Sequence, residues 1–258
     1  MEYELLNPFV GFTIGILVGC LGIGGGALMM PYLLYGVHLE PILAVGTDLA
    51  VAAGMKMLGA FEHARLGTVD WPRVGWLALG SVPGIALVSA GLLSVVGSDR
   101  AAMNLWIVRA VGMALLLIAT LSLFRPWLLK LQGYLGVSRV PVGGRRAGLA
   151  VTGFAVGALV ALTSVGSGTL VGLVLLTATS LSAHKIVGTD LAHALIVIFV
   201  GALFHVGAAT VQWPVVLSLL VGGLPGVWVG SRLSVGIPEA AVRVGISVVL
   251  VITGASLV

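Results

Sequence analysis

The chain has 258 residues, of which 59% are hydrophobic and only 9% are charged. Soluble domains carry about 25% charged residues, so this composition excludes an ordinary water-soluble protein. Apolar stretches of about 18 to 25 residues recur from end to end and predict an all-α, polytopic membrane protein whose partner is the lipid bilayer. The net charge of +4 is spread over loops, which argues against nucleic-acid binding. A single cysteine, Cys20, excludes an internal disulfide and a cysteine-based metal cluster, and we expect no cofactor.

The first apolar segment, Pro8–Tyr35, is interrupted by the run Gly22-Ile23-Gly24-Gly25-Gly26. Each glycine weakens a helix by roughly 1 kcal/mol relative to alanine, so the helix is expected to break here. In lipid, unwound backbone persists only where it is buried in protein or lines a polar cavity. A similar run, 164–168, breaks a second apolar segment 142 residues later. Two matched breaks are typical of a transporter's binding site. The alternative is that the glycines only allow close helix packing.

The chain is an internal duplication. Shifting the sequence by 142 positions aligns Gly15–Gly84 with Gly157–Gly226 without a gap, and about 28 of the 70 aligned positions are identical. The motif Val-Gly-Thr-Asp-Leu-Ala occurs at 45–50 and again at 187–192. These matches divide the chain into a first transmembrane repeat at 1–124, a basic cytoplasmic linker at 125–146 and a second transmembrane repeat at 147–258.

Each repeat contains one broken apolar segment followed by three unbroken ones. The expected segments are Pro8–Tyr35, Pro41–Ala64, Arg73–Val96 and Asn104–Phe124 in the first repeat, and Ala147–Thr179, His184–Gly207, Pro214–Leu233 and Ala240–Val258 in the second. The linker between the repeats carries five basic residues and no acid, which is typical of a cytoplasmic loop.

The two repeats are expected to be inverted. If each broken segment is a re-entrant hairpin, three segments of each repeat cross the membrane and both chain ends lie outside. Arg100 is then the only basic loop residue outside, as the positive-inside rule favours. The aligned stretches 62–65 and 204–207 differ in charge, which also suits opposite faces. The alternative is eight full spans, which would make the repeats parallel.

Backbone N–H groups and helix N-termini exposed by the breaks carry partial positive charge, which suits an anion. The second break adds serine and threonine hydroxyl donors, whereas the first offers backbone alone. Together with the Gly-Thr-Asp motifs and a nearby lysine, the breaks define the expected substrate-binding residues, which are Gly24, Gly25, Gly26, Thr47, Lys56, Ser164, Gly166, Ser167, Gly168 and Thr189.

Ionisable residues inside apolar segments predict function, because they are costly to keep in a membrane. Asp48 and Asp190 occupy equivalent places and are candidates for proton coupling; the alternative is that the motif's Thr and Asp cap helices that begin just after it. Lys56 lies two turns after Asp48, so we expect an ion pair with Asp48 or Asp190 that an anion could replace. His193 is a further candidate for proton coupling, although a buried hydrogen-bonding role is the alternative.

Two further histidines, His63 and His205, align with one another near the ends of their segments. We expect interfacial positions for both, with gating or proton relay as the alternative. Because aromatic residues gather at membrane interfaces, Trp71 and Trp213 are interpreted as interface anchors.

The paired breaks, the two Gly-Thr-Asp-Leu motifs, Lys56 and the steps Val-Asp-Trp (69–71) and Val-Gln-Trp (211–213) resemble the sulfite exporter TauE/SafE family. The resemblance is to its uncharacterised membrane permease branch and covers nearly the whole chain. It implies multi-pass plasma-membrane transport of small anions, such as sulfite and organosulfonates, in a bacterium or archaeon. Many relatives carry serine where this chain has Asp48 and Asp190, so the resemblance leaves the substrate and the coupling ion open.

We therefore expect a secondary transporter, an exporter of a small anion, that works by alternating access around a midplane site with proton coupling. The alternative is a passive anion channel that uses the same half-helix ends. The sequence contains no His-Glu zinc motif, Gly-x-Ser-x-Gly elbow or phosphate-binding loop, so an enzyme is not expected. A scaffold for partner proteins is disfavoured, because the linker is the only sizeable soluble segment. The sequence leaves open whether the protein forms a homo-oligomer.

Overall fold

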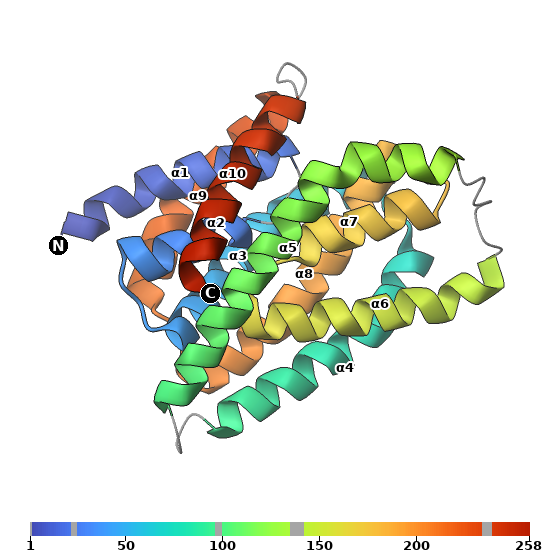
Figure 1. Ribbon diagram of the computed structural model, residues 1–258. Coiled ribbons are helices and arrows are strands. Elements are labelled where there is room, and N and C mark those ends of the chain that lie inside the picture. Colours follow the sequence, from blue (N-terminus) through green and yellow to red (C-terminus); the bar gives the residue numbers. More distant parts are fainter. Residues whose placement is uncertain (1, 22–24, 96–99, 135–141, 234–238) are drawn as a thin grey trace.

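The computed structural model describes residues 2–21, 25–95, 100–134, 142–233 and 239–258, which are helical nearly throughout (Figure 1). The helices in these ranges are α1 (Glu2–Leu21), α2 (Gly26–Pro31), the π-helical turn η1 (Tyr32–Gly36), α3 (Pro41–Arg65), α4 (Trp71–Val95), α5 (Arg100–Tyr134), α6 (Val142–Thr163), α7 (Ser167–Ala178), α8 (Ala183–Gly207), α9 (Trp213–Leu233) and α10 (Glu239–Leu257).

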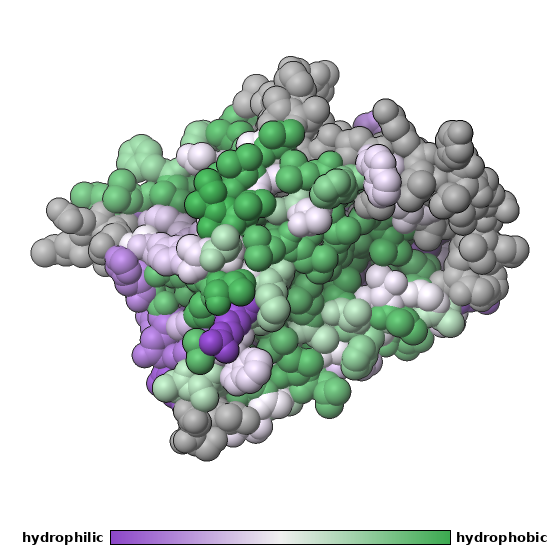
Figure 2. Space-filling model, in the orientation of Figure 1, coloured by the Kyte–Doolittle hydropathy of each residue, from purple (hydrophilic) through white to green (hydrophobic). Residues whose placement is uncertain are grey.

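Six helices in the described ranges are long and apolar enough to cross a membrane, namely α3, α4, α5, α6, α8 and α9. Parts of α1, α7 and α10 form shorter apolar helices. Figure 2 shows that apolar side chains dominate the face carrying α5 and α10, whereas hydrophilic side chains gather at its left edge. Exposed apolar side chains are expected where a surface meets lipid, so the chain is a multi-pass, all-α membrane protein.

The helices follow the order of the duplicated sequence. Helices α1 to α5 belong to the first repeat and correspond to α6 to α10 of the second, with η1 and α2 together matching α7. Helix α5 continues to Tyr134, through the first part of the segment expected as a linker, and α6 already begins at Val142.

The chain reverses direction at both breaks (Figure 1). In the first repeat, η1 returns alongside the beginning of α1, where the hydroxyl of Tyr32 donates to Oδ1 of Asn7 at 2.6 Å. Gly25 packs against Val18 on α1, and a Cβ atom at Gly25 would lie 2.9 Å from that side chain. In the second repeat, α7 turns back along α6 in the same way. Both reversals are consistent with re-entrant hairpins, which stay a prediction, because α6 by itself is long and apolar enough to cross a membrane.

The first helix of each repeat packs along the fourth helix of the other repeat. Helix α1 lies against α9, and α6 lies against α4. Both contacts use glycines: a Cβ atom at Gly222 would lie 1.7 Å from the carbonyl oxygen of Pro8, and one at Gly80 would lie 1.8 Å from that of Ala150. Glycine therefore brings the two backbones closer than any side chain would allow. The repeats are interlocked rather than side by side.

Helices α3 and α8 form the buried centre and run antiparallel. The beginning of α3, at Gly46, contacts Thr210 just beyond the end of α8. The beginning of α8, at Gly188, contacts Thr68 just beyond the end of α3. Two equivalent helices that run in opposite directions are consistent with inverted repeats, whereas parallel repeats would have aligned them.

Replacing Gly80 with alanine tests the interlocked packing. The added methyl group would collide with the backbone of α6, and overpacking of this kind costs about 1–3 kcal/mol of folding free energy. Gly75 lies on the same helix with nothing within 4 Å of its Cβ position, so Gly75→Ala is the matched control. Thermal unfolding in detergent should show a lower midpoint for Gly80→Ala and an unchanged or higher one for Gly75→Ala. Equal midpoints would contradict the packing.

Candidate functional site

The two Gly-Thr-Asp motifs lie inside the two most buried helices. Helix α3 begins at Pro41 and α8 at Ala183, so each motif follows more than one full turn of helix. The alternative in which Thr and Asp cap helices that begin just after the motif is therefore wrong. Asp48 and Asp190 are instead buried within continuous helices, where they are 1% and 5% exposed.

The two chain breaks meet at Asp48. Gly26, at the start of α2, packs against the second break, and a Cβ atom there would lie 2.6 Å from the carbonyl oxygen of Ser164 and 2.8 Å from Oδ2 of Asp48. Ser164 and Gly166 both adopt left-handed backbone conformations, with φ of 57° and 104°. Glycine adopts this conformation without steric cost, which explains its presence before α7. Gly24 lies outside the described residues.

Lys56 is the cation of this region and is only 2% exposed. Its Nζ atom donates a hydrogen bond of 2.8 Å to Oγ of Ser167, the first residue of α7. The carboxylates of Asp190 and Asp48 act on its charge from farther away. The direct partner is thus a hydroxyl group rather than the carboxylate that the sequence led us to expect.

The N-terminus of α7 points its free N–H groups at the same place. Gly166 occupies the N-cap position of this 12-residue helix and supplies no side chain to cap it. Ser167 and Gly168 are the first residues of the helix, so their N–H groups have no partner within the helix itself, and both residues are buried. The partial positive charge of the helix end therefore lies beside the ammonium group of Lys56.

Several buried polar atoms around Lys56 make no hydrogen bond within the described part of the chain. They are Asp48 Oδ2, Ser164 Oγ, Asp190 Oδ1 and His193 Nδ1, and of these the side chains of Asp48 and Ser164 lie beside one another. His193 is fully buried, and its other ring nitrogen, Nε2, lies 2.9 Å from Oγ of Ser81. Because unsatisfied buried polar atoms are rare and costly, a cluster of them marks a place that binds water or a polar ligand.

A small cavity adjoins the cluster. It has room for about one water molecule. Gly25, Asp48 and Lys56 supply its polar side, and the apolar side is lined by Val18, Met29, Val51, Ala52 and Met55. The space that the described residues leave at this cavity is smaller than an oxyanion.

The two threonines of the motifs contact loops of the opposite repeat. Thr47 Oγ1 accepts a hydrogen bond of 3.1 Å from the backbone N–H of Gln212, and Thr189 Oγ1 accepts one of 2.9 Å from that of Asp70. The structure therefore brings Lys56, Ser164, Ser167 and the two acids toward one region, and places both threonines in contacts between the repeats.

Sequence reasoning missed two features of this region. Ser81, the partner of His193, stands in the apolar segment of α4 without a polar counterpart in the second repeat. Thr68 and Thr210 bond to the histidine five residues before each of them. Their identical spacing from His63 and His205 in the two repeats was the signal that could have revealed these contacts.

The profile of the family described as "Sulfite exporter TauE/SafE" matches residues 8–257. The chain belongs to this family. Among similar TauE/SafE-like sequences, "Probable membrane transporter protein YjnA" of Bacillus subtilis (strain 168) is 30% identical over 249 residues, which cover 96% of this chain and 97% of the relative. "Probable membrane transporter protein YdhB" of the same organism is 26% identical over 250 residues, which cover 97% and 98%. No solved structure matches the chain. TauE/SafE membership and these relatives identify a membrane transporter.

A double-mutant cycle tests whether Lys56 and Asp190 form one charge cluster. Lys56→Met removes the cation and leaves the buried carboxylates without a positive charge nearby, so the unfolding midpoint should fall. Adding Asp190→Asn to that variant should restore part of the thermal stability, because one negative charge is removed with the positive one. If the effects of the two substitutions on the unfolding midpoint simply add, the residues are not coupled.

Proposed function

We propose that this TauE/SafE protein is a secondary transporter that exports a small anion, sulfite or an organosulfonate, across the plasma membrane of a bacterium or archaeon. The family description names sulfite export, and the curated relatives carry the name of membrane transporters. The observation that carries the proposal is the hydrogen bond between buried Lys56 and Ser167, because it joins a cation to a free helix N-terminus.

An anion fits this place for two physical reasons. The N-terminus of α7 offers backbone N–H donors and the positive end of the helix dipole, which together suit an oxyanion. Lys56 adds a full positive charge and rotatable ammonium donors next to the same helix end. Three kinds of hydrogen-bond donor therefore lie close together and can bind the oxygen atoms of an anion. They are the Lys56 ammonium, the Ser167 hydroxyl and the first N–H groups of α7.

We base alternating access on the small size of this cavity and on the repeated architecture. The cavity has room for about one water molecule, so substrate can enter only after the helices around it move. In this proposal the two broken segments are re-entrant hairpins, and the two repeats are inverted copies of one another. Rocking of one such unit against the other exposes a central site first to one face and then to the other.

The charges around Lys56 are the basis on which we propose proton coupling. The cluster contains one ammonium group and the two carboxyl groups of Asp48 and Asp190, and all three residues are buried. An entering anion brings a further negative charge into a medium that penalises unbalanced charge. We propose that one carboxylate takes up a proton as the anion binds, so that the two move together and the combined gradients of anion and proton set the direction of net transport. His193 lies in the same cluster and is a candidate to pass that proton.

Flux through reconstituted protein tests the role of Lys56. Proteoliposomes containing the wild-type protein should transport labelled sulfite or a sulfonate, and Lys56→Met should reduce the initial rate roughly 10- to 100-fold, as expected for loss of a charge-assisted contact. Lys185→Met is the matched control, since Lys185 is exposed at the start of α8. Wild-type flux in a Lys56→Met protein that still folds would remove the lysine from the mechanism.

An imposed pH gradient separates the proton-coupled carrier from the passive anion channel. If a proton travels with the anion, the wild-type protein should carry a sulfonate faster from the acidic side to the alkaline side than in reverse, and the rate should saturate. Asp190→Asn should abolish this directional difference, because it removes one of the two carboxyl groups that could carry the proton. A rate that neither saturates nor responds to the gradient would instead support a channel.

A further inference from the structure

Two loops, one in each repeat, are closed by the same pair of side chains. After α3, Thr68 donates from Oγ1 to the carbonyl oxygen of His63 at 3.0 Å, and this Oγ1 lies 2.8 Å from Nδ1 of the same histidine. After α8, Thr210 and His205 repeat the arrangement at 3.1 Å and 2.8 Å. Each loop is therefore held in a fixed shape by its own repeat.

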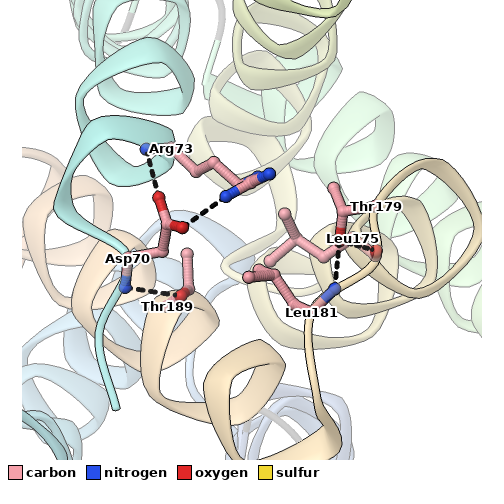
Figure 3. Close-up of polar contacts among 6 residues, drawn as sticks. All are labelled: Asp70, Arg73, Leu175, Thr179, Leu181 and Thr189. Carbon is pink, nitrogen blue, oxygen red and sulfur yellow. Dashed lines mark hydrogen bonds and ion pairs between the residues drawn. The ribbon is translucent and has the colours of Figure 1, made fainter. Parts of the chain in front are cut away.

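Each loop then reaches across to the other repeat. The backbone N–H of Asp70 donates to Thr189, as Figure 3 shows, and the backbone N–H of Gln212 donates to Thr47. The glycine before each threonine makes room for the loop: a Cβ atom at Gly46 would lie 2.4 Å from the carbonyl oxygen of Thr210. We call these two contacts the Thr189 latch (63–70 with 188–189) and the Thr47 latch (205–212 with 46–47).

The two latches lie at opposite ends of the antiparallel pair α3 and α8, and the charge cluster lies between them. Lys56 follows Thr47 by nine residues, or about 13 Å along α3, and precedes the histidine of the Thr189 latch by seven, or about 10 Å. Each latch also adjoins one acid of the cluster, because Asp48 follows Thr47 directly and Asp190 follows Thr189. Each acid is therefore the sequence neighbour of a threonine that contacts the other repeat, so a change in its charge acts next to that contact.

We infer that the two latches are the gates of the transporter, one for each membrane face, and that Thr47 and Thr189 are the positioning residues that hold them shut. This inference rests on the proposed alternating access and assigns it to particular contacts. A single neutral hydrogen bond holds the loop to each threonine. Loss of this bond shifts the equilibrium between the closed and the open latch by roughly fivefold, so either latch can open without unfolding the protein. The neighbouring acid links opening to the charge of the cluster.

The two gates are unequal. In the Thr47 latch, His205 and Thr210 are both buried. The Thr189 latch is half-buried, and there the Asp70 carboxylate pairs with Arg73, a pair whose counterparts in the second repeat are Gln212 and Val215 (Figure 3). The side chains that close the loop of the Thr189 latch are thus more exposed than those of the Thr47 latch, although the hydrogen bonds to the two threonines are both part-buried. The Thr189 latch lies at the end of α3 that carries Arg65, close in sequence to Arg73 at the start of α4, and this end is expected to face the cytoplasm.

Labelling of an introduced cysteine from each membrane face tests the inference. In a Cys20→Ser background, Ala52→Cys places a thiol in the lining of the central cavity. Thr189→Val should raise its reaction rate with a membrane-impermeant maleimide roughly fivefold in vesicles of one orientation, and Thr47→Val should do so only in vesicles of the opposite orientation. Thr189→Ser keeps the acceptor oxygen and should label like the parent. Thr120→Val is the matched control, since Thr120 lies exposed on α5 and its hydroxyl bonds within its own helix.

The outcomes separate this inference from the proposed function. Labelling that is unchanged, or that rises from the same face in both valine variants, overturns the gates even if anion flux is observed. Opposite-face labelling without flux of any tested anion supports the gates and counts against the proposed substrate. If a valine variant does not fold, a cross-link between Thr47→Cys and Gln212→Cys in the Cys20→Ser background gives a second test. The cross-link should block labelling of Ala52→Cys from one face until the disulfide is reduced. Continued labelling of this thiol from both faces would overturn the inference.

Discussion

A charged side chain inside a membrane protein depends on partners that the protein supplies, because lipid offers none. Lys56 meets this requirement across the boundary between the repeats, where its ammonium group bonds to Ser167 at the start of α7. That contact fixes the start of α7, just after the second break, against the central helix of the other repeat. The acids Asp48 and Asp190 balance the same charge from two different helices. The geometry of the site thus follows from the need to supply one buried lysine with a hydrogen-bond acceptor and nearby negative charge.

The duplication supplies a symmetric frame, and the site arises where the two copies differ. Helix packing, the two latches and the left-handed loop residues Gly67 and Ala209 all recur in both repeats. The central position does not: Ile198 stands where the first repeat has Lys56, and Val51 stands where the second has His193. A symmetric frame gives two equivalent conformations that open to opposite faces, while an asymmetric centre needs only one cation to hold one anion.

Much of the fold was predictable because each signal lay within one repeat. The glycine breaks, the order of apolar segments and the face shared by Asp48 and Lys56 follow from composition and helical periodicity alone. Contacts between repeats were not predictable from either copy. Thr47 was expected to bind substrate, yet its hydroxyl accepts a hydrogen bond from a loop of the other repeat. Lys56 was expected to pair with a carboxylate, yet it donates its hydrogen bond to Ser167. Ser81 carried no signal, because its role depends on the approach of α4 to α8.

Locating a bound anion tests the account most directly. Selenite is a heavier analogue of sulfite, and the anomalous scattering of selenium marks its position in a crystal of the protein. The account predicts a selenium peak about 4 Å from Lys56 Nζ and from the first N–H groups of α7, because selenite oxygens accept hydrogen bonds of about 2.9 Å from these donors. A peak confined to another part of the protein, or no peak at Lys56 at a concentration that saturates transport, would contradict it.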